Sequence, residues 1–276
     1  MYYNSVVEGK KPYNQSYFKQ RVKEIPNDPA YKLHEMALVE VIIPEFGRLP
    51  HTRRILDMGC GLGFMTAEFE QLNSAEAVGV DPSSFAISLA KKEHKGVKFY
   101  SKSASSFSRD MSTLGEDPFD IAILNMVLHS VDDETALAIL KDVNKCLKPG
   151  GLIVVVAPTP EWLRKKLWEY AFDQGWDNIT GPLWIQEMLA TQRVELPHKI
   201  HSEKDYKHVI PVYQRSYAHY AHLFSMNNYG IERPVRDYRG RLIEREYLPC
   251  IQVADSTSCN YMADKKERII IKSRAL

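Results

Sequence analysis

The sequence predicts an α/β fold built on a mostly parallel, doubly wound sheet. Short apolar runs suited to buried strands alternate along residues 53–157 with segments whose apolar residues recur at helical spacing. Between the first such run and the first such helix lies a turn with glycine at every second position, Gly59, Gly61 and Gly63. A strand that passes through a glycine turn into a helix is typical of the first unit of a parallel sheet.

The glycine turn also indicates a nucleoside ligand. Without Cβ atoms, the three glycines would let a ligand approach the backbone, and the following helix would present unpaired N–H groups. Asp81 ends the second predicted strand, 22 residues after Gly59. A carboxylate at that place can accept hydrogen bonds from both hydroxyls of a ribose. A dinucleotide fingerprint would need its third glycine where Phe64 stands, which disfavours a nicotinamide oxidoreductase.

Three segments resemble class I S-adenosylmethionine (SAM)-dependent methyltransferases. The stretch from Asp57 to Gly63 reads D-x-G-x-G-x-G, which is similar to the family's first motif. Residues 128–131 read L-H-x-V after the fourth predicted strand, and residues 147–151 read L-K-P-G-G before the fifth. The resemblance covers about residues 53–157 and implies a seven-stranded sheet whose last strand is antiparallel. It implies SAM as cofactor, with S-adenosylhomocysteine as its product.

The resemblance also implies which residues contact the cofactor. The glycine turn would hold its amino-acid part, the end of the second strand its ribose, the end of the third its adenine, and the end of the fourth its methionine end. The expected contacts are Asp57, Gly59, Cys60, Gly61, Gly63, Asp81, Pro82, Ser103, Ala104, Asn125 and Met126. The family commonly has aspartate where this chain has Ser103, so we expect a weaker hydrogen bond to adenine there.

His129 has two interpretations. A histidine at the start of a helix often makes structural hydrogen bonds. His129 also follows the fourth strand, at the carboxyl edge of the sheet beside the expected methyl donor, and is therefore the candidate general base.

The regions flanking the core predict a lid and a cap. Residues 1–30 are rich in aromatic side chains, with a short helix expected around Ser16–Glu24. They form either a surface arm over an apolar edge or a lid over the cofactor. A further helix is expected over 31–46, before the first strand of a core that spans 31–157. Residues 158–212 predict a helical cap lined with aromatic residues, which shape an acceptor pocket or form the cap's own small core. The candidates for acceptor contact are Tyr13, Tyr17, Phe18, Trp162, Arg215 and Tyr217.

The C-terminal part of the core, residues 213–276, predicts a helix and the last two strands. The helix opens at Tyr213 and closes near Gly230, and the strands are expected at Leu248–Val253 and Arg268–Lys272. We interpret His198, His201 and His208 as solvated loop histidines, since no Cys or carboxylate partners them at ligand spacing, and expect no metal.

Composition and cysteine usage indicate a cytoplasmic protein. Lys and Arg total 36 against 35 Asp and Glu, so net charge gives no reason to expect a nucleic-acid partner. The four cysteines lack C-x-x-C spacing, and no apolar stretch approaches a membrane span. A homo-oligomer remains possible. We expect methyl transfer to O, N or C of a small, apolar or aromatic specialised metabolite. The alternatives are an RNA methyltransferase, or a SAM-binding regulator or scaffold without turnover.

Overall fold

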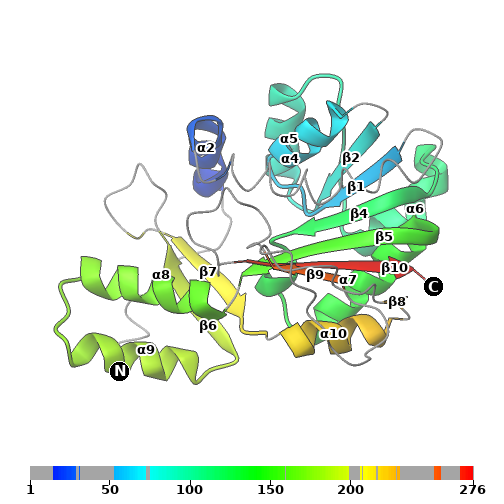
Figure 1. Ribbon diagram of the computed structural model, residues 1–276. Helices are drawn as coiled ribbons and strands as arrows, with labels where there is room; N and C mark the ends of the chain where they lie inside the picture. The colour runs from blue at the N-terminus through cyan, green and yellow to red at the C-terminus, as the bar shows by residue number, and fades with distance from the viewer. Residues whose placement is uncertain are drawn as a thin grey trace.

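A computed structural model describes residues 15–28, 31, 53–72, 75–158, 160–198, 206, 208–215, 217–227, 229–230, 252–255 and 268–275. Its centre is one sheet whose strands lie in the order β3-β2-β1-β4-β5-β10-β8, with β9 also paired to β10 (Figure 1). The strands are β1 (Arg53–Met58), β2 (Ala75–Asp81), β3 (Lys98–Ser101), β4 (Phe119–Asn125), β5 (Leu147–Pro158), β8 (Tyr229–Gly230), β9 (Gln252–Asp255) and β10 (Arg268–Ala275).

The first five strands are parallel and β10 runs antiparallel to β5. This confirms the predicted α/β class, the parallel sheet and the antiparallel last strand. The described residues hold eight strands in this sheet, where seven were expected, because the short strands β8 and β9 both pair with β10. Of the strand expected at Leu248–Val253, the structure describes Gln252 and Val253, which lie in β9 (Gln252–Asp255). Gly230 lies in β8 and so does not end a helix.

Helices cover both faces of the sheet. They are α4 (Phe64–Glu70), α5 (Ser84–Glu93), α6 (Ala104–Leu114), α7 (Asp133–Cys146) and α10 (Tyr217–Ser225), with a single 3₁₀ turn, η2 (Leu128–Ser130), before α7. The helix predicted to open at Tyr213 therefore starts at Tyr217.

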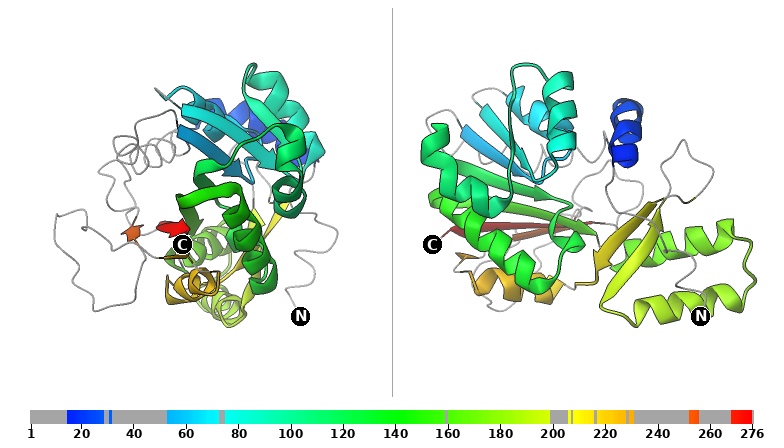
Figure 2. Two further views of the ribbon diagram at one scale, coloured as in Figure 1. Left: turned by 90° about the vertical axis from the view of Figure 1, so that its right-hand side faces the viewer. Right: turned by 180° about the vertical axis from the view of Figure 1, so that it is seen from behind.

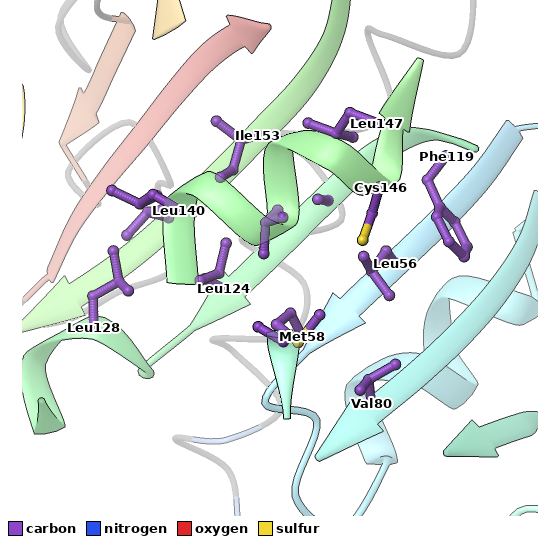
Figure 3. Close-up of a cluster of buried hydrophobic side chains, with 14 of the residues drawn as sticks. Leu56, Met58, Val80, Phe119, Leu124, Leu128, Leu140, Cys146, Leu147 and Ile153 are labelled. Atoms are coloured by element: carbon purple, nitrogen blue, oxygen red, sulfur yellow. The ribbon is translucent and has the colours of Figure 1, made fainter. Parts of the chain in front are cut away.

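Alternate residues of β1 supply two separate cores. Leu56 lies beside Cys146 of α7 on one face (Figure 3), whereas Ile55 belongs to the cluster with Phe69 of α4 on the other. Since successive side chains of a strand point to opposite faces, a strand buried on both sides reads as a continuous apolar run. This is why the central strands could be predicted from sequence.

The insertion after β5 is part helix and part strand. It consists of α8 (Pro160–Asp173), α9 (Thr180–Leu189) and an antiparallel pair, β6 (Arg193–His198) and β7 (His208–Tyr213), set apart from the main sheet (Figure 2). Its own core includes Trp162, Tyr170 and Val194. The predicted helical cap thus also contains a β-hairpin, which the sequence did not lead us to expect.

The loop prediction is wrong for two histidines. His198 is the last residue of β6 and is half-buried, and His208 is the first residue of β7 with only 3 % of its surface exposed. It faces His198 across the β6–β7 pair, and both belong to the hairpin. His201 lies outside the described residues.

The N-terminal helix α2 (Gln15–Glu24) confirms the helix expected around Ser16–Glu24, and the 3₁₀ turn η1 (Ile25–Asn27) follows it. Phe18 and Ile25 pack with Leu62 of the glycine turn and Ala86 of α5. Tyr13, and the helix expected over 31–46 apart from Tyr31, lie outside the described residues. Within the part of the chain that the structure describes, no helix has both the length and the apolar character needed to span a membrane.

Candidate functional site

The glycine turn folds back onto the end of β2. The backbone N–H groups of Gly59 and Cys60 both donate to the carbonyl oxygen of Val80, at 2.7 and 3.1 Å. Gly59, Gly61 and Gly63 all have positive φ, at 81°, 54° and 75°. These values lie in the left-handed region that favours glycine. The turn thus joins the carboxyl ends of two adjacent parallel strands.

A methyl group added at each glycine would meet different surroundings. At Gly59 it would lie 2.4 Å from Cγ2 of Val127, and at Gly63 2.5 Å from the ring of Phe99. At Gly61 it would meet no protein atom within 4 Å. Packing therefore requires two of the three glycines, whereas Gly61 borders open space in which a ligand could contact the backbone. The turn fits the cofactor that its sequence pattern implies.

Asp81 lies beside this open space. Its Oδ2 accepts a hydrogen bond from the N–H of Gly61 at 3.0 Å, and its Oδ1 accepts one from the N–H of Ser83 at 2.8 Å. Burial raises the pKa of this carboxyl, although the two N–H donors oppose the shift. Each oxygen retains a second lone pair, so the carboxylate can also accept from the hydroxyls of a ribose.

Asp57 lies almost completely buried at the end of β1, with 1 % of its surface exposed. The hydroxyl of Thr66 donates to its Oδ2 at 2.6 Å. Burial, together with the negative charge of Asp81, raises the pKa of Asp57 to about 7, and the Thr66 hydrogen bond opposes the shift. Burial likewise raises the pKa of the Cys60 thiol, which favours its neutral form. A cationic ligand bound beside Asp57 would lower this pKa again and so favour the ionised carboxylate near neutral pH.

The carboxyl end of β4 carries backbone strain. Met126 has φ of 58°, which makes it the single non-glycine residue with positive φ in the described part of the chain. Its N–H donates to the carbonyl oxygen of Val156 on β5 at 2.9 Å, which fixes the bend. Strained residues of this kind gather at ligand sites. Asn125, the last residue of β4, and Met126 lie where the resemblance places the methionine end of the cofactor.

Ser103 and Ala104 follow β3, the strand that pairs with β2. The Ser103 hydroxyl accepts from the N–H of Ser106 at 3.2 Å and thereby caps α6. The side chain is exposed, and Ala104 is buried beside it. Ser83 caps α5 after Pro82 in the same way. Both caps lie at the edge of the sheet that carries the glycine turn.

The candidate base His129 belongs to η2 and is buried, with 3 % exposed. Val127, at the start of this turn, packs on Gly59. The structure therefore places His129 two residues after Val127, the residue that packs on the glycine turn, and its catalytic role stays a prediction.

The acceptor candidates fall in different places. Tyr17 of α2 contacts the hairpin, with its ring centroid 5.5 Å from that of His208, and Phe18 packs on the glycine-turn side. Trp162 lies in the insertion's own core, and Tyr217 begins α10. The prediction that Arg215 contacts an acceptor is corrected. Its side chain is fully buried and donates hydrogen bonds to protein atoms, so it does not face an acceptor.

Sequence reasoning missed three residues that shape the site. The hydroxyl of Thr66 donates a hydrogen bond to Asp57. The side chains of Val127 and Phe99 leave no space for a Cβ atom at the first and third glycines of the turn. Thr66 lies nine residues after Asp57 on the following helix, so the spacing offered a signal; the two packing residues offered none.

Comparison with known proteins agrees with this geometry. A family model described as "methyltransferase domain" matches residues 31–216, more than half of the chain. The chain belongs to this family. With its glycine turn and sheet order it is a class I SAM-dependent methyltransferase domain, and SAM is its cofactor.

Its relatives vary in substrate. The methyltransferase domain is 36 % identical over 116 residues to a ubiquinone biosynthesis O-methyltransferase of Bradyrhizobium sp. strain ORS 278, covering 40 % of this chain and 41 % of that protein. It is 25 % identical over 122 residues to an mRNA cap guanine-N(7) methyltransferase of Schizosaccharomyces pombe, covering 41 % and 34 %. The chain thus spans between about a third and two fifths of the length of these two relatives.

A solved structure shares the fold. Magnesium protoporphyrin IX methyltransferase of Synechocystis PCC 6803, with bound S-adenosylhomocysteine, superposes with a TM-score of 0.56 at 15 % identity, covering 96 % of this chain and 97 % of that one. Among the described residues of the methyltransferase domain, no group of three or more His, Cys, Asp or Glu side chains could hold a metal ion.

Proposed function

We propose that this protein transfers the methyl group of SAM to an O, N or C atom of a small, apolar or aromatic specialised metabolite. The observation that carries the proposal is the open space at Gly61, bordered by the Asp81 carboxylate. This edge of the sheet offers backbone N–H groups, a carboxylate suited to a ribose and a buried carboxyl within one βαβ unit. The relative from Bradyrhizobium, an O-methyltransferase, supports a small acceptor.

The chain's own residues have three tasks in this reaction. SAM supplies an electrophilic methyl group on a positively charged sulfur, and the bond between them breaks as the acceptor's lone pair forms the new bond. Asp81 holds the ribose, Asp57 stabilises the cationic amino-acid end, and Gly61 allows close approach of the backbone. Positioning of this kind is worth about 7–11 kcal/mol in favourable intramolecular cases. For a hydroxyl acceptor, His129 accepts the proton that is lost.

We propose that α2 and the insertion enclose the acceptor as lid and cap. The carboxyl ends of the central strands point toward α2 and the β6–β7 hairpin (Figure 1). Phe18 of α2 packs beside the glycine turn, and the neighbouring Tyr17 contacts His208 and His198, with ring centroids 5.5 and 6.4 Å apart. The helix therefore joins the cofactor side to the hairpin. Closure would exclude water from the methyl donor and leave aromatic surface for the acceptor.

The test is turnover with methyl-labelled SAM. The purified protein is incubated with fractionated small-molecule extract of the source cell in one arm and with capped RNA in the other. We expect label in a small organic product, identified by mass, and none in RNA. The Gly61→Ala variant is the control, because it should fold and lose the labelled product.

Two other results would replace the proposal. Label in RNA would favour the second candidate, which the 25 % identity to the cap guanine-N(7) methyltransferase supports. Cofactor binding without label in either arm would indicate a SAM-binding regulator or scaffold.

A further inference from the structure

Arg215 connects the return of the insertion to the turn beside the cofactor site. Its side chain is completely enclosed. Nη1 donates to the carbonyl oxygen of Leu128 at 2.5 Å, and Nη2 donates to that of Val131 at 2.6 Å. Nε donates to Oδ1 of Asp133 at 2.8 Å. Arg215 lies two residues after the end of β7, so one guanidinium fixes both ends of η2 and the start of α7 to the point where the insertion rejoins the core.

The turn that Arg215 holds forms a wall of the glycine turn. The N–H and the hydroxyl of Ser130 both donate to the carbonyl oxygen of Val127, at 3.1 and 2.7 Å, and close the turn. The side chain of Val127 packs on Gly59, and the strained Met126 immediately precedes it. A shift of the backbone at Leu128 or Val131 would therefore move the residue that covers Gly59.

Asp133 keeps the guanidinium in place. Its second oxygen, Oδ2, lies 2.8 Å from Nε2 of His219 on α10. Burial alone would raise the pKa of Asp133, but hydrogen bonds from Arg215 and His219 hold this pKa below its ordinary value. The guanidinium carbon also lies 5.4 and 5.8 Å from the ring centroids of Tyr213 and Tyr220. Four parts of the chain thus meet at one buried cation.

We propose that Arg215 is a positioning residue for the cofactor site, acting through the turn from Val127 to Val131. The proposal rests on the function proposed above and adds a residue that does not touch the cofactor. If Arg215 is replaced by an apolar residue, two carbonyl groups lose a charged donor, and buried acceptors left unpaired favour a rearranged backbone. The turn then no longer holds Val127 against Gly59, and cofactor binding weakens.

The test compares Arg215→Met with Arg54→Met. Arg54 is a matched control because its guanidinium bonds Glu116 and the carbonyl of Asp117, at the opposite, amino end of β1. Thermal unfolding without ligand and calorimetric titration with S-adenosylhomocysteine are measured for both. We expect both variants to lose stability, and only Arg215→Met to bind the product at least about tenfold more weakly, a change of roughly 1.4 kcal/mol.

Amide hydrogen exchange gives a second readout that general destabilisation would not move. Arg215→Met should speed exchange at Ser130, whereas Arg54→Met should not. Arg215→Lys, which keeps the charge and can reach one carbonyl, should recover part of the affinity. If Arg215→Met does not fold, Arg215→Lys and Arg54→Lys are compared in the same way.

Three results separate the possible failures. Affinity within about twofold of wild type in Arg215→Met would overturn the positioning role, as would an equal loss in Arg54→Met. A wild-type protein that binds no S-adenosylhomocysteine would instead overturn the proposed function on which this role rests.

Discussion

Replacing Gly61 with alanine separates ligand binding from folding. Its φ of 54° lies near the left-handed helical minimum, and no protein atom lies within 4 Å of the added methyl group. Adopting this conformation costs a non-glycine residue roughly 1–2 kcal/mol. For a chain of this size, each 1 kcal/mol corresponds to a fall in Tm of about 2–4 °C. The methyl group would project into the space that we assign to the cofactor, so binding should suffer far more than stability.

Gly63→Ala is the matched comparison, because Gly63 also has a positive φ but its surroundings leave no space for an added methyl group. The added methyl group would lie 2.5 Å from the Phe99 ring and 3.0 Å from Cβ of Ala90. Overpacking of this kind costs about 1–3 kcal/mol beyond the backbone term. Thermal unfolding and titration with S-adenosylhomocysteine are measured for both variants. We expect Gly61→Ala to keep most of its stability and to lose affinity at least about tenfold, and Gly63→Ala to lose more stability. Unchanged affinity in Gly61→Ala would refute the assignment.

The remaining predictions concern three carboxyl groups. Asp81→Ala should weaken S-adenosylhomocysteine binding by at least about 1–3 kcal/mol, whereas Glu76→Gln, at the amino end of the same strand where it pairs with Arg54, should leave affinity unchanged in the same titration. Because the pKa of Asp57 is raised to about 7 in the folded protein, this group binds its proton more tightly when folded. Its contribution to stability should therefore fall as pH rises from 4 to 7, and Asp57→Asn should remove that slope in urea unfolding. Cofactor binding should release protons near pH 7, seen as a buffer-dependent heat that Asp57→Asn lacks; the same heat in both proteins would contradict this. The pKa of Asp133 is lowered instead, so its stabilisation is present at neutral pH and lost as pH falls through its folded pKa. Asp133→Asn should thus be less stable than wild type at pH 7, and the difference should become smaller as pH falls below 4 in urea unfolding; a difference that does not change with pH would contradict it.

The core of the fold was predictable because its signals are local. Strands buried on both faces read as apolar runs, and the positive φ values of the turn require glycine, which the sequence displays directly. The outer sheet was less predictable. The two-residue strand β8 pairs with β10 through Gly230 and Tyr229 and carries no apolar pattern of its own. A short edge strand is specified by its partner, so its residues alone could not reveal it.

The hairpin of the insertion was missed for a related reason. Val194 and Leu196 alternate as a strand requires, but the two strands are joined by a long connection without a tight-turn sequence. Burial of His208 follows from this pairing and from the contact with Tyr17, which lies far away in the sequence.

The site was predictable where its contacts join residues that are close in the sequence. It was not predictable where a side chain bonds a backbone group far away in the sequence. The glycine turn and Asp81 lie within one βαβ unit, so their spacing carried the information. Arg215 looked like an acceptor-binding residue, yet its partners include the carbonyl of Leu128, 87 residues earlier. Carbonyl groups are present at every position, so no sequence pattern indicates which of them a buried arginine will bind.

The most direct test of the account is a crystal structure of this protein with S-adenosylhomocysteine. We predict the ligand along the carboxyl ends of β1, β2 and β4, with its ribose hydroxyls on the Asp81 carboxylate and its amino-acid part against the backbone at Gly61. A ligand bound elsewhere, or an empty glycine turn at saturating ligand, would contradict the assignment of this edge as the cofactor site.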